Sequence, residues 1–179
     1  MTPTPLHGVP MRIHYDNEQH AADFIRLNEA WIGEYFRLEE ADRALARDPM
    51  RIVREGGSIL TLSNRGEVIG ACALLREEDG VMQLARMAVA AGERGKGWGR
   101  ILLATALQRA RQLGARRVRL FSNTRLGAAI HLYEAFGFRA VHRGPHPRYA
   151  RCNIVMECEL PPVEAGGTPS TGPAPEVEA

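Results

Sequence analysis

The sequence predicts a single α/β domain, a mixed β-sheet of about seven strands flanked by helices on both faces. Two observations predict this class. Short runs rich in Val, Ile and Leu alternate with longer segments whose apolar residues form one helical stripe. Several strand-like runs also follow one another across glycine-containing turns. The chain has 179 residues, 45% hydrophobic and 25% charged, which suits one domain with a buried core.

Each expected element has its own local signal. Strands are expected where apolar or alternating runs are bounded by turn residues, at 11–15, over a hairpin at 58–77 that turns at Asn64–Gly66, and at 80–89, 116–123, 138–143 and 151–160. Helices are expected where apolar residues form one stripe, at 21–35, 39–48, 100–114 and 127–137. Asn17 or Asp16 is the expected N-terminal cap of the first helix.

The prolines separate a body from two ends. Of the 11 prolines, all but Pro49, Pro145 and Pro147 lie in the ranges 1–10 and 161–179. We therefore expect a flexible leader over 1–10, a folded domain over 11–160, and a disordered tail rich in Pro, Gly and Glu over 161–179.

Charge and hydropathy narrow the class of protein. The net charge of +2 is too small an excess to predict nucleic-acid binding. No apolar run approaches the ~20 residues of a membrane span, so no membrane partner is expected. The first residues lack the apolar run of a signal peptide, and a cytoplasmic location is expected.

The segment from Arg94 to Arg100, RGKGWGR, joins a predicted strand to a predicted helix and holds the only lysine of the chain. Its glycines permit positive φ and let an anion approach the backbone N–H groups, where the helix dipole adds roughly +0.5 of a charge. Two common phosphate loops do not fit. A dinucleotide loop needs glycine at Arg100, and a P-loop needs Ser or Thr at Gly97 and glycine at Ala90.

The pattern that does fit is R-x-x-G-x-G, from Arg94 to Gly99. A second segment, LFSNTRLGAAIHLYEAFGF, follows it at 120–138. Together the two segments resemble the acyl-CoA loop and the strand–asparagine–helix segment of the GCN5-related N-acetyltransferases, the GNAT family. The expected order of elements over 11–160 is similar to that fold.

The resemblance implies that acetyl-CoA is the co-substrate and that it lies between two diverging central strands. The backbone near Val89 would hold the pantetheine arm and stabilise the oxyanion of the reaction, and Asn123 would touch the same arm. The loop N–H groups would hold the pyrophosphate. The residues implied in acetyl-CoA binding are Met87, Ala88, Val89, Arg94, Gly95, Lys96, Gly97, Trp98, Gly99, Arg100, Asn123 and Tyr133.

The resemblance also assigns catalytic roles. Tyr133 stands where the family has a thiol-facing tyrosine, and a phenol of pKa ~10 can protonate a thiolate of pKa ~8.5. The alternative for Tyr133 is a packed core aromatic. Many relatives carry a glutamate base where this chain has Gln83, which cannot accept a proton. Glu39 and Asp42 are then candidates for holding or deprotonating the amine, with an acidic helix cap as the alternative role.

The expected reaction is direct attack of an amine on the thioester in a ternary complex, with neither a covalent enzyme intermediate nor a metal. The cysteines match no zinc spacing and are expected in strands away from the motifs; they are Cys72, Cys152 and Cys158.

The acceptor is expected to be a small amine or an amino acid. Arg143, Arg148 or Arg151 could bind an acceptor carboxylate, or could form a solvated basic turn. A protein or peptide amine is the competing acceptor, and a non-catalytic acyl-CoA sensor is the competing class. A homodimer is an assembly that the resemblance allows.

Overall fold

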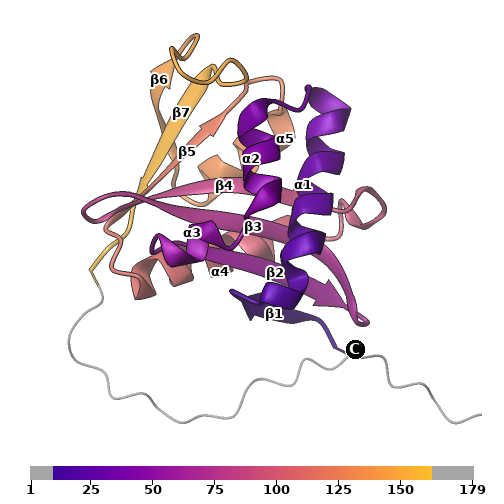
Figure 1. Cartoon of the computed structure of the whole chain (residues 1–179). Helices are drawn as coiled ribbons and strands as arrows, with labels where there is room; N and C mark the ends of the chain where they lie inside the picture. The colour runs from indigo at the N-terminus through magenta and orange to yellow at the C-terminus, as the bar shows by residue number, and fades with distance from the viewer. Residues whose placement is uncertain (1–9, 163–179) are drawn as a thin grey trace, which may run out of the picture.

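The computed structural model describes residues 10–162, and its regular elements run from Arg12 to Glu159. The predicted leader over 1–10 and tail over 161–179 lie almost entirely outside the described residues. Seven strands form one sheet in the order β1-β2-β3-β4-β5-β7-β6 (Figure 1). The β4–β5 pair is parallel and the other pairs are antiparallel, which confirms the predicted mixed sheet.

The elements follow the predicted order. The strands are β1 (Arg12–Tyr15), β2 (Ser58–Asn64), β3 (Glu67–Glu78), β4 (Val81–Val89), β5 (Arg117–Ser122), β6 (Arg139–Arg143) and β7 (Ile154–Glu159). The helices are η1 (Glu18–His20), α1 (Ala21–Tyr35), α2 (Glu40–Arg47), α3 (Arg51–Arg54), η2 (Ala91–Glu93), α4 (Trp98–Gln112) and α5 (Gly127–Ala135). The one-turn helix α3 is an addition, because four residues are too few to produce a helical stripe.

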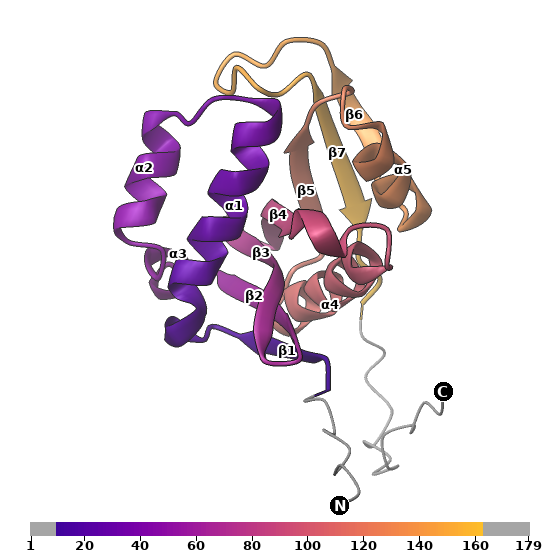
Figure 2. The same cartoon turned by 90° about the vertical axis from the view of Figure 1, so that its right-hand side faces the viewer.

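The helices form two layers, one on each face of the sheet. Helices α1, α2 and α3 lie on one face, and α4 and α5 lie on the other (Figure 2). Strand β3 is buried on both sides, so its successive side chains enter different cores. Ala71 and Ala73 pack with α1 and α3, whereas Cys72 and Leu74 pack with α4. This double burial explains the nearly continuous apolar run of the central strands.

Strands β4 and β5 pair over only part of their length. The pairing runs from Val81↔Arg117 to Leu84↔Leu120, and β5 then continues against β7 as far as Ser122↔Ile154. Beyond Leu84 the two strands diverge, as the different directions of β4 and β5 in Figure 1 show. The predicted splayed central pair is therefore present, and it leaves the last five residues of β4 without a neighbour on that side.

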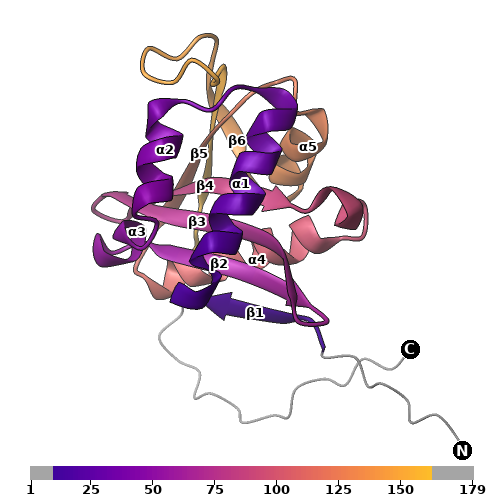
Figure 3. The same cartoon turned by 45° about the vertical axis from the view of Figure 1, so that its right-hand side comes forward.

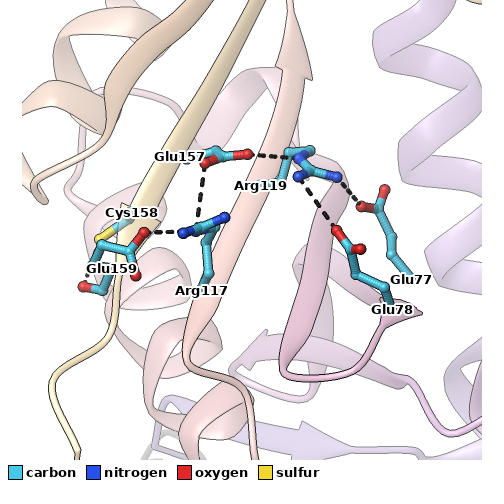
Figure 4. Close-up of polar contacts among 7 residues, drawn as sticks. All are labelled: Glu77, Glu78, Arg117, Arg119, Glu157, Cys158 and Glu159. Carbon is cyan, nitrogen blue, oxygen red and sulfur yellow. Dashed lines mark hydrogen bonds and ion pairs between the residues drawn. The ribbon is translucent and has the colours of Figure 1, made fainter.

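A ladder of ion pairs crosses the sheet where β4 and β5 are still paired. Arg119 of β5 bonds Glu157 of β7 at 2.8 Å and Glu77 of β3 at 2.9 Å, so it spans β4 (Figure 4). Arg117 bonds Glu159 at 2.6 Å. Exposed pairs of this kind contribute about 0–1 kcal/mol each, but Arg119 and its two partners are largely shielded from solvent. These ion pairs therefore link β3, β5 and β7 at the end of the sheet where β4 and β5 are still paired.

The N-terminal cap differs from the prediction. Asn17 accepts a hydrogen bond from the Gln19 N–H and caps η1, not α1. Asp16 accepts from the Ile59 N–H and pairs with Arg109, so it joins β2 to α4. The prediction was wrong because one 3-10 turn precedes the α-helix, and local sequence does not distinguish the two helix types.

Candidate active site

One cavity of about 470 Å³ occupies the opening between β4 and β5. Its walls come from α1, the end of β4, the glycine loop, the end of β5, α5 and the loop between β6 and β7. The predicted cofactor residues that line it are Met87, Ala88, Val89, Arg94, Gly95, Gly97, Trp98, Gly99, Asn123 and Tyr133. Lys96, Arg100 and Asp42 are not part of its lining, whereas Glu39 and Gln83 are.

The glycine loop presents its backbone at the start of α4. Gly95 and Gly97 have φ of +78° and +87°, a conformation that other residues rarely adopt. Among the described residues, no backbone carbonyl accepts a hydrogen bond from the N–H groups between Gly95 and Arg100. These donors and the N-terminal end of the helix dipole form a site for an anion such as a pyrophosphate. A Cβ at either glycine would meet nothing within 4 Å, so the space beside the backbone is open.

Two of the three basic side chains between Arg94 and Arg100 are already paired with carboxylates. Arg94 forms two bonds to Glu34 of α1, at 2.7 and 3.0 Å, and a third to the Val89 carbonyl at 3.2 Å. Lys96 bonds Glu93 at 3.2 Å, and Trp98 donates its indole N–H to the same carboxylate at 3.0 Å. The Arg94 guanidinium therefore ties the loop to α1.

Tyr133 lies on α5 with its ring against Phe138 and is 9% exposed. Burial, with a smaller contribution from Cys72, raises the pKa of the Tyr133 phenol to about 12. Its hydroxyl bonds to none of the described residues, and the side chain lines the cavity. Tyr133 thus presents a protonated phenol at neutral pH, with its hydrogen-bonding capacity free for a ligand.

Asp42 is buried at the start of α2, with 1% of its side chain exposed. It accepts bonds from the Glu39 N–H at 2.7 Å, from Arg151 at 3.0 Å and from Arg86. Burial opposes its ionisation, but these hydrogen bonds outweigh burial and lower the pKa of the carboxyl below its ordinary 3.8. A low pKa and a position outside the cavity lining disfavour Asp42 as the base. The helix-cap alternative describes it better.

Arg86 is a site residue that sequence reasoning missed. It lies in β4 with φ of +58°, where the β3–β4 register shifts, and it also donates to the Asn28 side chain at 3.2 Å. The available signal was a charged residue inside an otherwise apolar run, because an arginine is rarely buried without a partner. The unusual φ of a non-glycine residue is a further mark of a functional position.

The loop between β6 and β7 supplies one arginine to the cavity. Arg151 lines it, and Arg143 and Arg148 do not. The loop and the α1–α2 link lie at the same end of the molecule (Figure 3), where Arg151 donates to the Arg37 carbonyl at 3.3 Å. Asn123 lines the cavity and holds this loop by donating to the Arg151 carbonyl at 3.1 Å.

The prediction for Cys152 was wrong. It was expected within a strand away from the motifs, but it precedes β7 and lines the cavity. Its thiol contacts the Ile154 carbonyl at 3.3 Å, and burial raises its pKa. A thiol held protonated in this way is a poor nucleophile.

Within residues 10–162, no group of three or more His, Cys, Asp or Glu side chains is placed to hold a metal ion. No helix in the same range is both long and apolar enough to span a membrane.

A splayed strand pair that opens onto a helix N-terminus is suited to a ligand that carries an anionic group. The model of the acetyltransferase (GNAT) family matches residues 21–138, and the chain belongs to this family. It is therefore an acetyl-CoA-dependent acetyltransferase.

Solved structures share the fold. A GNAT-family acetyltransferase from Staphylococcus aureus Mu50 is 19% identical, with a TM-score of 0.74 over 84% of this chain and 99% of that one. The acetyltransferase yncA from Salmonella typhimurium, solved with its cofactor acetyl-CoA, is 22% identical, with a TM-score of 0.68 over 89% and 99% of the two chains. No curated protein matches the sequence.

Proposed function

We propose that the enzyme transfers the acetyl group of acetyl-CoA to a small primary amine or amino acid by direct attack in a ternary complex. The observation that carries the proposal is the continuity of the cavity. It runs from the glycine loop past Tyr133 to Glu39, Arg86 and Arg151. A thioester held along β4 and an amine entering from α2 and the β6–β7 loop would therefore meet in one space.

In the proposed reaction the amine nitrogen forms a bond to the thioester carbonyl carbon, and the carbon–sulfur bond then breaks. Backbone N–H groups near Val89 stabilise the negative oxygen of the intermediate. Tyr133 donates a hydrogen bond to the leaving thiolate, and it does not end as a phenolate, because a phenol with a pKa of about 12 is a weaker acid than a thiol of pKa ~8.5. The second proton of the attacking nitrogen is released as the amide forms and passes to the thiolate, directly or through the Tyr133 hydroxyl, so CoA leaves as the free thiol.

The proton of the ammonium must leave before attack, because a primary amine of pKa ~10.4 is largely protonated at neutral pH. Gln83 lines the cavity but cannot accept a proton. Asp42 is bound by two guanidinium groups. Glu39 lines the cavity and caps the start of α2. We therefore assign Glu39 the role of the base, which takes the ammonium proton directly or through water.

The experiment measures thiol release from acetyl-CoA over a panel of amino acids, polyamines and peptides. Release with amino acids or small amines, and not with peptides, supports the proposal. Release with peptides alone would support the competing protein or peptide acetyltransferase.

Tyr133→Phe tests the assigned mechanism. We expect a fall in kcat on the order of 10- to 100-fold with acetyl-CoA affinity nearly unchanged, because the substitution removes only the hydroxyl. Tyr35→Phe is the matched control, since Tyr35 is exposed and lies outside the cavity lining. An unchanged kcat in Tyr133→Phe would remove Tyr133 from the mechanism.

We also propose a cytoplasmic location, because the cysteines are free thiols, as a reducing compartment keeps them.

A further inference from the structure

Two arginines at the acceptor end of the cavity share one buried carboxylate. Arg86 comes from β4 and Arg151 from the β6–β7 loop, and both donate to the same oxygen of Asp42, Oδ1. Their side chains are 21% and 25% exposed, and both line the cavity. The Asp42 side chain is 1% exposed, so the two arginines and not Asp42 face the cavity.

The charges of this cluster do not balance. Two guanidinium groups face one carboxylate, which leaves one positive charge at the cavity wall. Glu39, the other acidic residue at this end of the lining, has an exposed side chain at the start of α2. The acidic residues beside the glycine loop, Glu34 and Glu93, already pair with Arg94 and Lys96. Because one carboxylate is shared by two half-buried guanidinium groups, this part of the cavity wall favours an anion.

Hydrogen-bond donors also remain available on both arginines. A guanidinium carries five N–H donors. Arg86 uses one nitrogen, Nη1, for both Asn28 and Asp42, and Arg151 uses Nη1 for Arg37 and Nη2 for Asp42. Within residues 10–162, Nε and Nη2 of Arg86 and Nε of Arg151 have no acceptor. These donors match the two oxygens of a carboxylate.

The arginines are held in place before any ligand binds. The Arg151 guanidinium lies over the Phe36 ring, 6.0 Å from its centroid, and it bonds Asp42 at 3.0 Å. Arg86 is fixed by Asn28, by Asp42 and by its left-handed backbone. Little side-chain entropy is therefore lost when an anion binds.

We infer that the acceptor is an amine that also carries a carboxylate, the class of the amino acids, and that Arg86 and Arg151 bind this carboxylate. Asp42 is a positioning residue that aims the two guanidinium groups into the cavity. The ammonium end of the acceptor then lies toward Glu39 and the thioester. This inference rests on the proposed acetyl transfer, since it names the acceptor of that reaction.

Matched acceptors test the inference on the unmodified enzyme. Thiol release is measured with an α-amino acid, with its amide and with the amine that lacks the carboxyl group. We expect kcat/KM for the acid to exceed that for the amide by roughly 10- to 100-fold, because only the acid supplies the charge that the arginines bind.

Arg151→Gln locates the effect. We expect KM for the amino acid to rise by about 10-fold or more, while kcat/KM for the amide changes by less than about threefold. Arg148→Gln is the matched control, from the same loop but outside the cavity lining, and should leave both acceptors unchanged. Arg151→Lys keeps the charge and should recover part of the loss.

The two possible failures are distinct. Equal rates for the acid, its amide and the carboxyl-free amine would overturn the carboxylate inference and leave the acetyl transfer standing. Thiol release from none of the amines would overturn the proposed acetyl transfer and this inference with it. Loss of activity toward acid and amide alike in Arg151→Gln, with the fold retained by circular dichroism, would also overturn the role of Arg151.

Discussion

The two ends of the cavity are both suited to anions, but they are built in opposite ways. At the glycine loop, consecutive backbone N–H groups and a helix N-terminus supply the site, and the charged side chains turn to Glu34 and Glu93. At the acceptor end, side chains from three separate segments meet around Asp42. A backbone site is fixed by local conformation and suits a ligand that never changes. A side-chain site can be altered by single substitutions.

The largest expected effect is that of Gly97→Asp in the glycine loop. A side chain there is strained at φ of +87° and puts a carboxylate beside the free N–H groups. We expect acetyl-CoA binding, measured by calorimetry, to weaken by more than about 100-fold.

Gly92→Asp is the control for Gly97→Asp. Gly92 lies in the preceding 3-10 turn, is not among the cavity lining, and has open space for a Cβ. Ordinary acetyl-CoA affinity in Gly97→Asp would refute the loop as the phosphate site, and the contrast between a backbone site and a side-chain site would no longer hold.

The second largest effect is expected for Asp42→Asn, at the acceptor end of the cavity. Removing a buried charge that two arginines share should cost about 1–3 kcal/mol of unfolding free energy at neutral pH, with acetyl-CoA affinity nearly unchanged. Because the pKa of Asp42 lies below 3.8 in the folded protein, its ionised form stabilises the fold above that pH. The stability difference between the variant and the unmodified protein should therefore narrow as the pH falls through the folded-state pKa.

Urea unfolding at a series of pH values measures this difference. Asp48→Asn is the control, because Asp48 ends the same helix in an exposed pair with Arg54. It should change stability by less than about 0.5 kcal/mol. A difference between Asp42→Asn and the unmodified protein that stays constant down to pH 2 would contradict the low pKa of Asp42.

The smallest effect is expected for Lys96→Gln. The Lys96 side chain is 54% exposed and its ammonium group pairs with Glu93, so its contribution to phosphate binding is screened. We expect the Kd for acetyl-CoA to rise by less than about threefold, and Lys96→Arg to leave it unchanged. A tenfold or greater rise would mean that side chains, and not only the backbone, hold the cofactor.

The two ends of the cavity also differ in how far the sequence predicts them. The glycine loop, the splayed strands and Tyr133 lie in contiguous segments whose pattern identifies them. The acceptor end depends on contacts between residues far apart in the chain, 44 positions for Arg86 and Asp42 and 109 for Arg151 and Asp42. The sequence left two roles open for Asp42, because a helix cap and a base require the same residue type at the same place. No local signal separated Arg151 from its neighbours Arg143 and Arg148.

Helix α1 touches both ends of the cavity. Its Asn28 holds Arg86, and its Glu34, six positions and about 9 Å further along the helix axis, holds Arg94 of the glycine loop. A shift of this helix when one substrate binds changes the fit of the other by the same free energy, because coupling between two sites is reciprocal. The affinity for the acceptor should therefore depend on whether acetyl-CoA is bound, although no side chain is shared between the glycine loop and the arginine pair.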